Sequence, residues 1–190
     1  MSSSSWQEYI EAAHRKLEIA AYHADCLREV VGDHTASSGS APAIAVQAHF
    51  EGVVVAVMAA VDQVAQAVNS ASQLHLNSSN LVEKAFTTLA ERLPEIGDWF
   101  REQIGLDLRR LRVRMVHYAY TKTPQGSHWI VESAGTGFSG SRELVAYATS
   151  AIEYGERLRS LLLRIEQELV RRRGSHLQMS LNIFCNWGCP

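Results

Sequence analysis

The chain has 190 residues, of which 46% are hydrophobic and 20% are charged, and its net charge is −2 at pH 7. This length predicts one domain with a sizeable core, and the near-neutral charge excludes a global attraction to nucleic acid, so any anion site must be local. Three cysteines make no disulfide framework, the N-terminus has no signal-peptide pattern, and the longest apolar run, 52–61, is too short to span a bilayer. We therefore expect a cytoplasmic protein without membrane association.

Two long helices are predicted in the N-terminal half. Apolar residues recur at alternating steps of four and three over 6–31, which predicts a helix that follows capping serines at 2–5 and ends near Gly32. A second helix is expected over 43–72. Its middle, 53–61, is apolar on nearly every side, which favours the most buried helix of the fold, with a strand as the competing prediction because β-branched residues are frequent there.

Shorter helices are predicted next. Asn80 followed by Glu83 is similar to a capping box and predicts the start of a helix that ends at Leu93. Pro94 starts another short helix, which is expected to end at Gly105. An arginine-rich helix follows.

The C-terminal half begins with a segment that has no helical pattern. Residues 121–141 hold one proline and four glycines and predict an irregular insertion or a small hairpin. Steps of four and three over 144–169 then predict a last long helix that ends at the basic residues and glycine of 171–174. The predicted fold class is all-α, a bundle of four main helices plus short helices, with a domain over 1–174 and a tail over 175–190.

The arginine-rich segment 106–120 places charge inside an apolar pattern. On a helical wheel Arg112 falls within the apolar arc and Arg109 falls near its edge. A buried guanidinium without a partner costs roughly several kcal/mol, so Arg112 either pairs with a carboxylate or faces a functional cleft. Asp62, an acid within the apolar second helix, is the predicted structural partner, although it could equally pair with Arg109 or with a backbone donor.

Arg112 and His117 together suit cleavage of a phosphodiester without a metal. Imidazole can take or give a proton near neutral pH, and a guanidinium can stabilise the charge of a phosphorane. Five positions turn by about 140° on a helix. One protomer would therefore aim the two side chains apart unless the helix ends near His117, or unless two copies meet around a dyad. The alternative is a solvated arginine face that ends in a histidine.

The segment Arg112-Val-Arg-Met-Val-His117-Tyr, at the end of the penultimate main helix of an all-α bundle, resembles the Arg-x4-6-His motif of HEPN domains (higher eukaryotes and prokaryotes nucleotide-binding). The resemblance implies a metal-independent endoribonuclease of a toxin–antitoxin or phage-defence system, which acts on RNA as a homodimer, with a cognate antitoxin as a further partner. It makes Arg112 and His117 the catalytic pair.

Other residues of the segment are candidates for substrate binding, because they could contact phosphates: Arg109, Arg110, Arg114 and Tyr118. Two positions depart from the family pattern. Val113 stands where HEPN motifs often have Asn or Asp, and Ala119 stands where some toxins have a modified tyrosine. These departures favour the alternative of a non-catalytic HEPN-like module that binds a nucleotide or a partner protein.

No metal or cofactor is predicted. Cys185 and Cys189 have no accompanying ligand pair at zinc-finger spacing, and no two histidines lie three or four residues apart.

Overall fold

The computed structural model describes residues 5–36, 43–72, 74, 76, 80–117 and 141–185. Side chains are outside the description at the ends of several helices, over 33–36, 43–44, 114–117, 141–144 and 174–185. The described residues form six α-helices and no strand, which confirms the all-α fold class. The predicted insertion lies outside the described residues, except that its last residue, Ser141, begins a helix.

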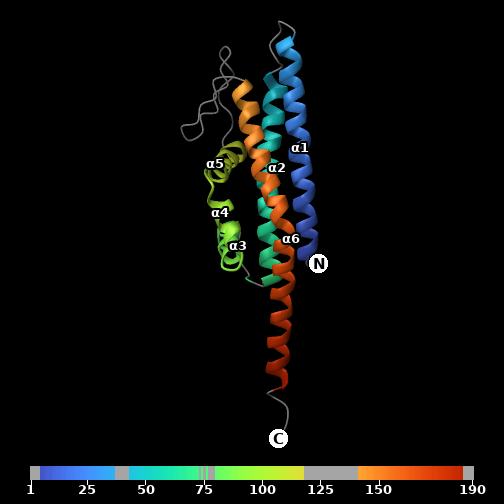
Figure 1. The fold of residues 1–190 in the computed structure, drawn as a ribbon, viewed down its shortest axis with the longest axis vertical. Coiled ribbons are helices and arrows are strands. Elements are labelled where there is room, and N and C mark those ends of the chain that lie inside the picture. Colours follow the sequence, from blue (N-terminus) through green and yellow to red (C-terminus); the bar gives the residue numbers. More distant parts are fainter. Residues whose placement is uncertain are drawn as a thin grey trace.

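Three long helices lie side by side and form the body of the protein (Figure 1). They are α1 (Trp6–Ala36), α2 (Ala43–Ser72) and α6 (Ser141–Cys185). The Ser5 hydroxyl accepts a hydrogen bond from the backbone N–H of Glu8 at 3.4 Å, as expected of an N-cap. The prediction that the first helix ends near Gly32 was wrong, because α1 continues for one more turn.

Three short helices lie in a row along one side of the long ones (Figure 1). They are α3 (Leu81–Ala90), α4 (Pro94–Arg101) and α5 (Gln103–His117). Asn80 is the N-cap of α3, but its side chain makes no capping hydrogen bond. The predicted capping box is therefore absent, and Asn80 contributes only its backbone carbonyl, which accepts from the N–H of Lys84 at 3.1 Å.

The boundary between α4 and α5 lies at Glu102 and not at Gly105, as was predicted. Glu102 has ψ of 144°, which ends α4, and Gly105 lies in the first turns of α5. Gly105 is where α5 passes the ring of Tyr154 on α6, and a Cβ there would lie 2.5 Å from the tyrosine hydroxyl oxygen. The glycine therefore marks a close helix–helix contact.

The prediction that the last helix ends at Gly174 was also wrong. The backbone of α6 stays helical to Cys185, and its C-terminal part runs past the ends of α1 and α2 (Figure 1). Basic residues and a glycine are common near a helix end, but neither stops a helix as proline does. The predicted tail over 175–190 is thus helical in its first part.

α2 is the central helix, as predicted, and it packs against α1, α3, α5 and α6. Its middle is buried on nearly every side, and the fully or almost fully buried residues include Val53, Val54, Val57, Met58, Ala60, Val61, Val64 and Val68. By length and composition Ala45–Ser72 would also suit a membrane span, but 61% of its most apolar window is buried in the bundle, as in a core helix.

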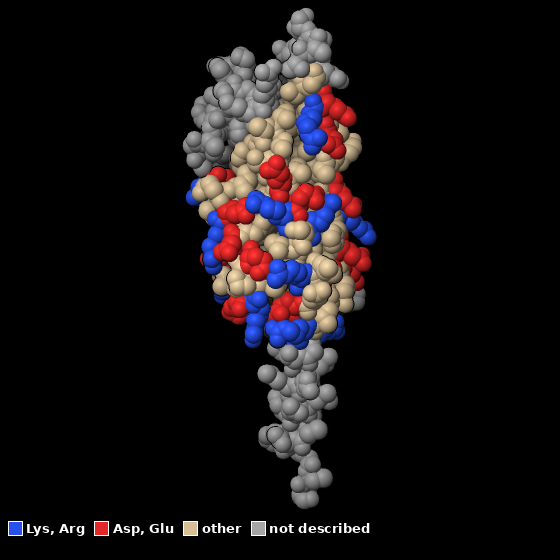
Figure 2. Space-filling model, in the orientation of Figure 1, with Lys and Arg blue, Asp and Glu red and all other residues tan. Residues whose placement is uncertain are grey.

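Charges of both signs are interspersed over the described residues of the face in Figure 2. Lysine and arginine side chains neighbour aspartate and glutamate over the lower part of this face, and no broad area has one sign. This distribution agrees with the near-neutral net charge of the chain.

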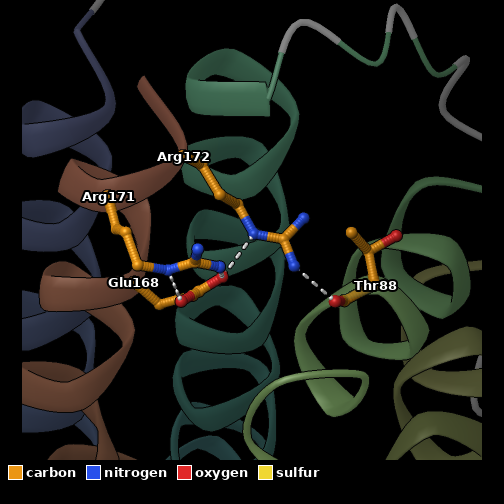
Figure 3. A network of polar contacts seen from close by, with 4 residues as sticks. All are labelled: Thr88, Glu168, Arg171 and Arg172. Carbon is orange, nitrogen blue, oxygen red and sulfur yellow. Dashed lines mark hydrogen bonds and ion pairs between the residues drawn. The ribbon is translucent and has the colours of Figure 1, made fainter. Parts of the chain in front are cut away.

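One buried carboxylate on α6 lies at the centre of a polar cluster (Figure 3). Glu168, whose side chain is 8% exposed, accepts from Nε and Nη2 of Arg171 and from Nε of Arg172, each at 2.8 Å. Arg172 also donates from Nη2 to the backbone carbonyl of Thr88 on α3 at 2.8 Å. Arg172 therefore joins α6 to α3, a role beyond the helix terminus that the sequence predicted.

Candidate functional site

α5 carries the residues of the predicted site and is held against α2, α4 and α6. Leu108 and Leu111 anchor it, because their side chains are 0% and 2% exposed. Apolar residues recur along α5 at steps of three and four and form this face, so the helix packs against the bundle through it. Arg112 follows directly after the second anchor and is thereby positioned beside α2.

Arg112 forms the predicted ion pair with Asp62 of α2. Nη1 of Arg112 lies 2.5 Å from Oδ2 of Asp62, and the two side chains are 34% and 29% exposed. The expectation of a buried pair was wrong in degree, because about a third of the surface of each side chain is accessible to solvent. Burial raises the pKa of Asp62, and the attraction and hydrogen bond of Arg112 lower it by less.

Arg109 is half-buried, so it is not the fully solvated side chain that one interpretation of the sequence expected, and its predicted contact with phosphate stays a prediction. Its Nη2 donates to the carbonyl of Phe100 at 3.0 Å, and its guanidinium carbon lies 4.1 Å from the centre of the Phe100 ring. The Phe100 ring also stacks on the ring of Phe86, with the two ring centres 4.6 Å apart and the planes nearly parallel. Burial lowers the pKa of Arg109, since the charged form loses water.

Arg110 is an exposed residue with a local partner. Its Nη1 lies 3.6 Å from Oδ1 of Asp107, and 58% of its side-chain surface is accessible. Val113, the position of the family departure, is 52% exposed. The side chains of Arg114 and His117 are outside the described residues, as is Tyr118 altogether, although α5 itself extends to His117.

The structure brings together two histidines that the sequence analysis did not connect. Nδ1 of His23 on α1 lies 3.2 Å from Nδ1 of His49 on α2. The ring of His23 packs against Gly52, where a Cβ would lie 2.5 Å from it. Burial lowers the pKa of His23, and the charge of His49 lowers it further. The signal in the sequence was Gly52, the single glycine of α2, because an isolated glycine within a helix can mark close approach of another group.

Among the residues whose side chains are described, no group of three potential metal ligands is present. The distance between the two Nδ1 atoms of His23 and His49 makes them a hydrogen-bonded pair, in which one ring nitrogen donates its proton to the other.

No family model matches the chain, and no curated protein and no solved structure matches it either. The HEPN resemblance thus rests on the helical architecture and on the segment that contains Arg112 and His117. The ribonuclease activity, RNA as substrate, the homodimer, the antitoxin partner and the cytoplasmic location stay predictions.

Proposed function

We propose that the chain is a metal-independent endoribonuclease of the HEPN type that acts as a homodimer. The observation that supports this function is that Arg112, held in place by its ion pair with Asp62, stays partly exposed on the same helix as His117, five residues away. On one helix these five positions turn the two side chains apart by about 140°. Two copies around a dyad can bring both Arg–His pairs into one cleft, so the active form that we propose is a homodimer.

The surroundings of Arg112 are compatible with this role. Its side chain is 34% exposed, so water and a phosphate can reach it, and Asp62 fixes its position from the α2 side. A guanidinium has five N–H donors, and the pair with Asp62 uses only some of them. Arg112 can therefore keep its carboxylate partner and still donate to a phosphate oxygen.

The reaction needs only proton transfer and charge stabilisation. His117 takes the proton of a ribose 2′-hydroxyl, and the freed oxygen attacks the adjacent phosphorus. Arg112 stabilises the additional negative charge of the phosphorane. The bond from phosphorus to the 5′-oxygen then breaks, and this oxygen receives a proton from His117 of the second copy. The products are a 2′,3′-cyclic phosphate and a 5′-hydroxyl.

Cleavage of a mixed RNA pool in the presence of a chelator tests the proposal. The wild type should produce 2′,3′-cyclic ends, and His117→Ala should cleave at least about 100-fold more slowly, the usual contribution of a general acid–base residue. His14→Ala, which removes a histidine from α1, is the matched control and should keep full activity. Equal cleavage by wild type and His117→Ala would contradict the proposal.

A second candidate is a non-catalytic module that binds a nucleotide or a partner protein. It is favoured by the observation that each described arginine side chain on α5 is held by a protein acceptor: Arg109 by a carbonyl, Arg110 by Asp107, and Arg112 by Asp62. If a nucleotide co-purifies with the chain and RNA is not cleaved, the chain is a binding module and not a ribonuclease.

The stability of Arg112 variants separates the two candidates. If the pair with Asp62 is mainly structural, Arg112→Ala should cost about 1–2 kcal/mol, between the values for exposed and buried pairs, because Asp62 is left without its cation. Asp62→Ala should also destabilise, and the double variant should lose less than the sum of the two. Thermal unfolding of the four proteins measures this, and additive losses would rule out the structural pair. An unchanged or higher melting temperature for Arg112→Ala, with loss of cleavage, would favour the catalytic role.

A further inference from the structure

A pocket of about 490 Å³ lies between α3, α4 and α5. Its apolar wall includes Val82 and Phe86 of α3, Phe100 of α4 and Leu106 of α5. Phe86 is 1% exposed, whereas Leu106 is 37% exposed and is one of the large apolar side chains that the fold leaves in contact with water. The volume falls within the range of roughly 300–1,000 Å³ that is usual for small-molecule sites.

Arg109 lines this pocket with a guanidinium that makes no ion pair with a described carboxylate, although the charge of Glu83 in the same lining favours its charged form. Among the described residues, no carboxylate lies within ion-pair distance of its guanidinium, which is held by the Phe100 carbonyl and ring. Its Nη1 is buried without a hydrogen-bond acceptor. The hydroxyl of Tyr154 lies close enough to favour the charged guanidinium, but that oxygen also has no partner of adequate geometry. A bound anion would stabilise a half-buried cation of this kind, because burial removes part of its hydration.

The other charged groups of the lining are Arg101 and Glu83, both of which are exposed. Together with Arg109 they give the pocket a net charge of about +1 by formal count. Thr87 adds one hydroxyl. An apolar wall with a surplus of one positive charge matches a ligand that has a hydrophobic body and a single negative head group.

We propose that the pocket between α3, α4 and α5 binds a small amphipathic anion, whose carboxylate, sulfonate or phosphate group pairs with Arg109 and whose aromatic or aliphatic body lies against Val82 and Leu106. The proposal is independent of the RNA chemistry at Arg112, because Arg112 pairs with α2 and does not line this pocket. A ligand there would satisfy the charge of Arg109 and cover the exposed side chain of Leu106.

Fluorescence titration of the full chain with 8-anilinonaphthalene-1-sulfonate tests the proposal, with the neutral N-phenyl-1-naphthylamine as its uncharged counterpart. The sulfonate should bind saturably with one site per chain, and the neutral compound should bind at least about tenfold more weakly, as expected for loss of a charge-assisted contact. Leu106→Trp should weaken sulfonate binding about tenfold or more, because the indole occupies the pocket, and its site is exposed enough to accept the larger ring.

Arg109→Met should weaken binding of the sulfonate and leave that of the neutral compound nearly unchanged. Arg110→Met is the matched control, since it removes an exposed arginine from the same helix and should bind like the wild type. If Leu106→Trp binds the sulfonate as tightly as the wild type, the pocket is not the site. If the neutral compound binds equally well, or if no saturable binding occurs, the assignment of an amphipathic anion is overturned.

Discussion

Replacement of Glu168 by glutamine should destabilise the bundle by breaking the link between α6 and α3. Glutamine keeps the shape of the side chain but loses the charge that accepts from both Arg171 and Arg172. Arg172, which is only 16% exposed, would then keep the Thr88 carbonyl as its main acceptor. A cation in such a position without a carboxylate is poorly compensated.

The size of the effect follows from the pKa of Glu168. The hydrogen bond from Arg171 is the largest cause that lowers this pKa, and with Arg172 it brings the value from the usual 4.5 to about 2. Each pKa unit corresponds to about 1.4 kcal/mol, so the difference sets an upper limit of about 3 kcal/mol. Arg171 is 52% exposed, and solvent screening of its charge reduces the expected loss to about 2 kcal/mol.

The pH dependence has a defined sign. Glu168 has a lower pKa in the folded than in the unfolded chain, so its contribution is fully present above about pH 4.5 and is lost as the pH falls toward about 2. Urea unfolding of the wild type and Glu168→Gln over this window should therefore give free energies that converge as the pH falls. Glu166→Gln, on the same helix, is the control and should stay within about 0.5 kcal/mol of the wild type. A constant difference between wild type and Glu168→Gln at every pH would refute the reasoning.

Two further predictions concern close contacts between helices. Gly105→Ala should destabilise the fold by about 1–3 kcal/mol, because its Cβ would meet the buried Tyr154 ring. Gly32→Ala, with open space around its Cβ, should stabilise the fold by about 0.5–1 kcal/mol. Chemical denaturation measures both free energies of unfolding, and equal effects would contradict the contact at Gly105. His23 has a lower pKa in the folded chain than its unfolded value of 6.5, so its contribution to stability is fully present above pH 6.5 and is lost as the pH falls. His49→Gln should raise the pKa of His23 toward the ordinary value in an NMR titration. An unchanged pKa of His23 would show that His49 has no influence.

The positions of the helices were largely predictable, because buried apolar residues recur along each helix with a regular period. The steps of four and three in α1 and α6 and the continuous apolar stretch in α2 correspond to the buried faces that the structure has. The ends were less predictable. Gly32, Gly105 and Gly174 each predict the end of a helix, yet each lies inside one. A glycine costs only about 1 kcal/mol in a helix, which tertiary packing readily outweighs.

The contact between Arg112 and Asp62 could be predicted because each is a charge within an apolar helical stripe, and such misfits need a partner. The other contacts gave no such signal. Arg172 reaches Thr88 through a backbone carbonyl, and His23 meets His49 across 26 positions of sequence. Contacts of this kind depend on how far one helix is shifted along another, which periodicity within a single helix does not determine.

The two arginines in the apolar stripe of α5 differ in how their charge is compensated, and this difference bears on where an anion can bind. Arg112 has a carboxylate, so a phosphate there must share the guanidinium with Asp62. Arg109 is held by a carbonyl, an aromatic ring and a neighbouring hydroxyl, and the charge of Glu83 acts on it without forming an ion pair. Among the described arginine side chains of α5, the one without a carboxylate in ion-pair contact thus lies on the side that faces α3 and α4. Binding strength alone would favour an anion beside Arg109, whereas catalysis at Arg112 gains from a weaker hold that strengthens only as charge develops in the transition state.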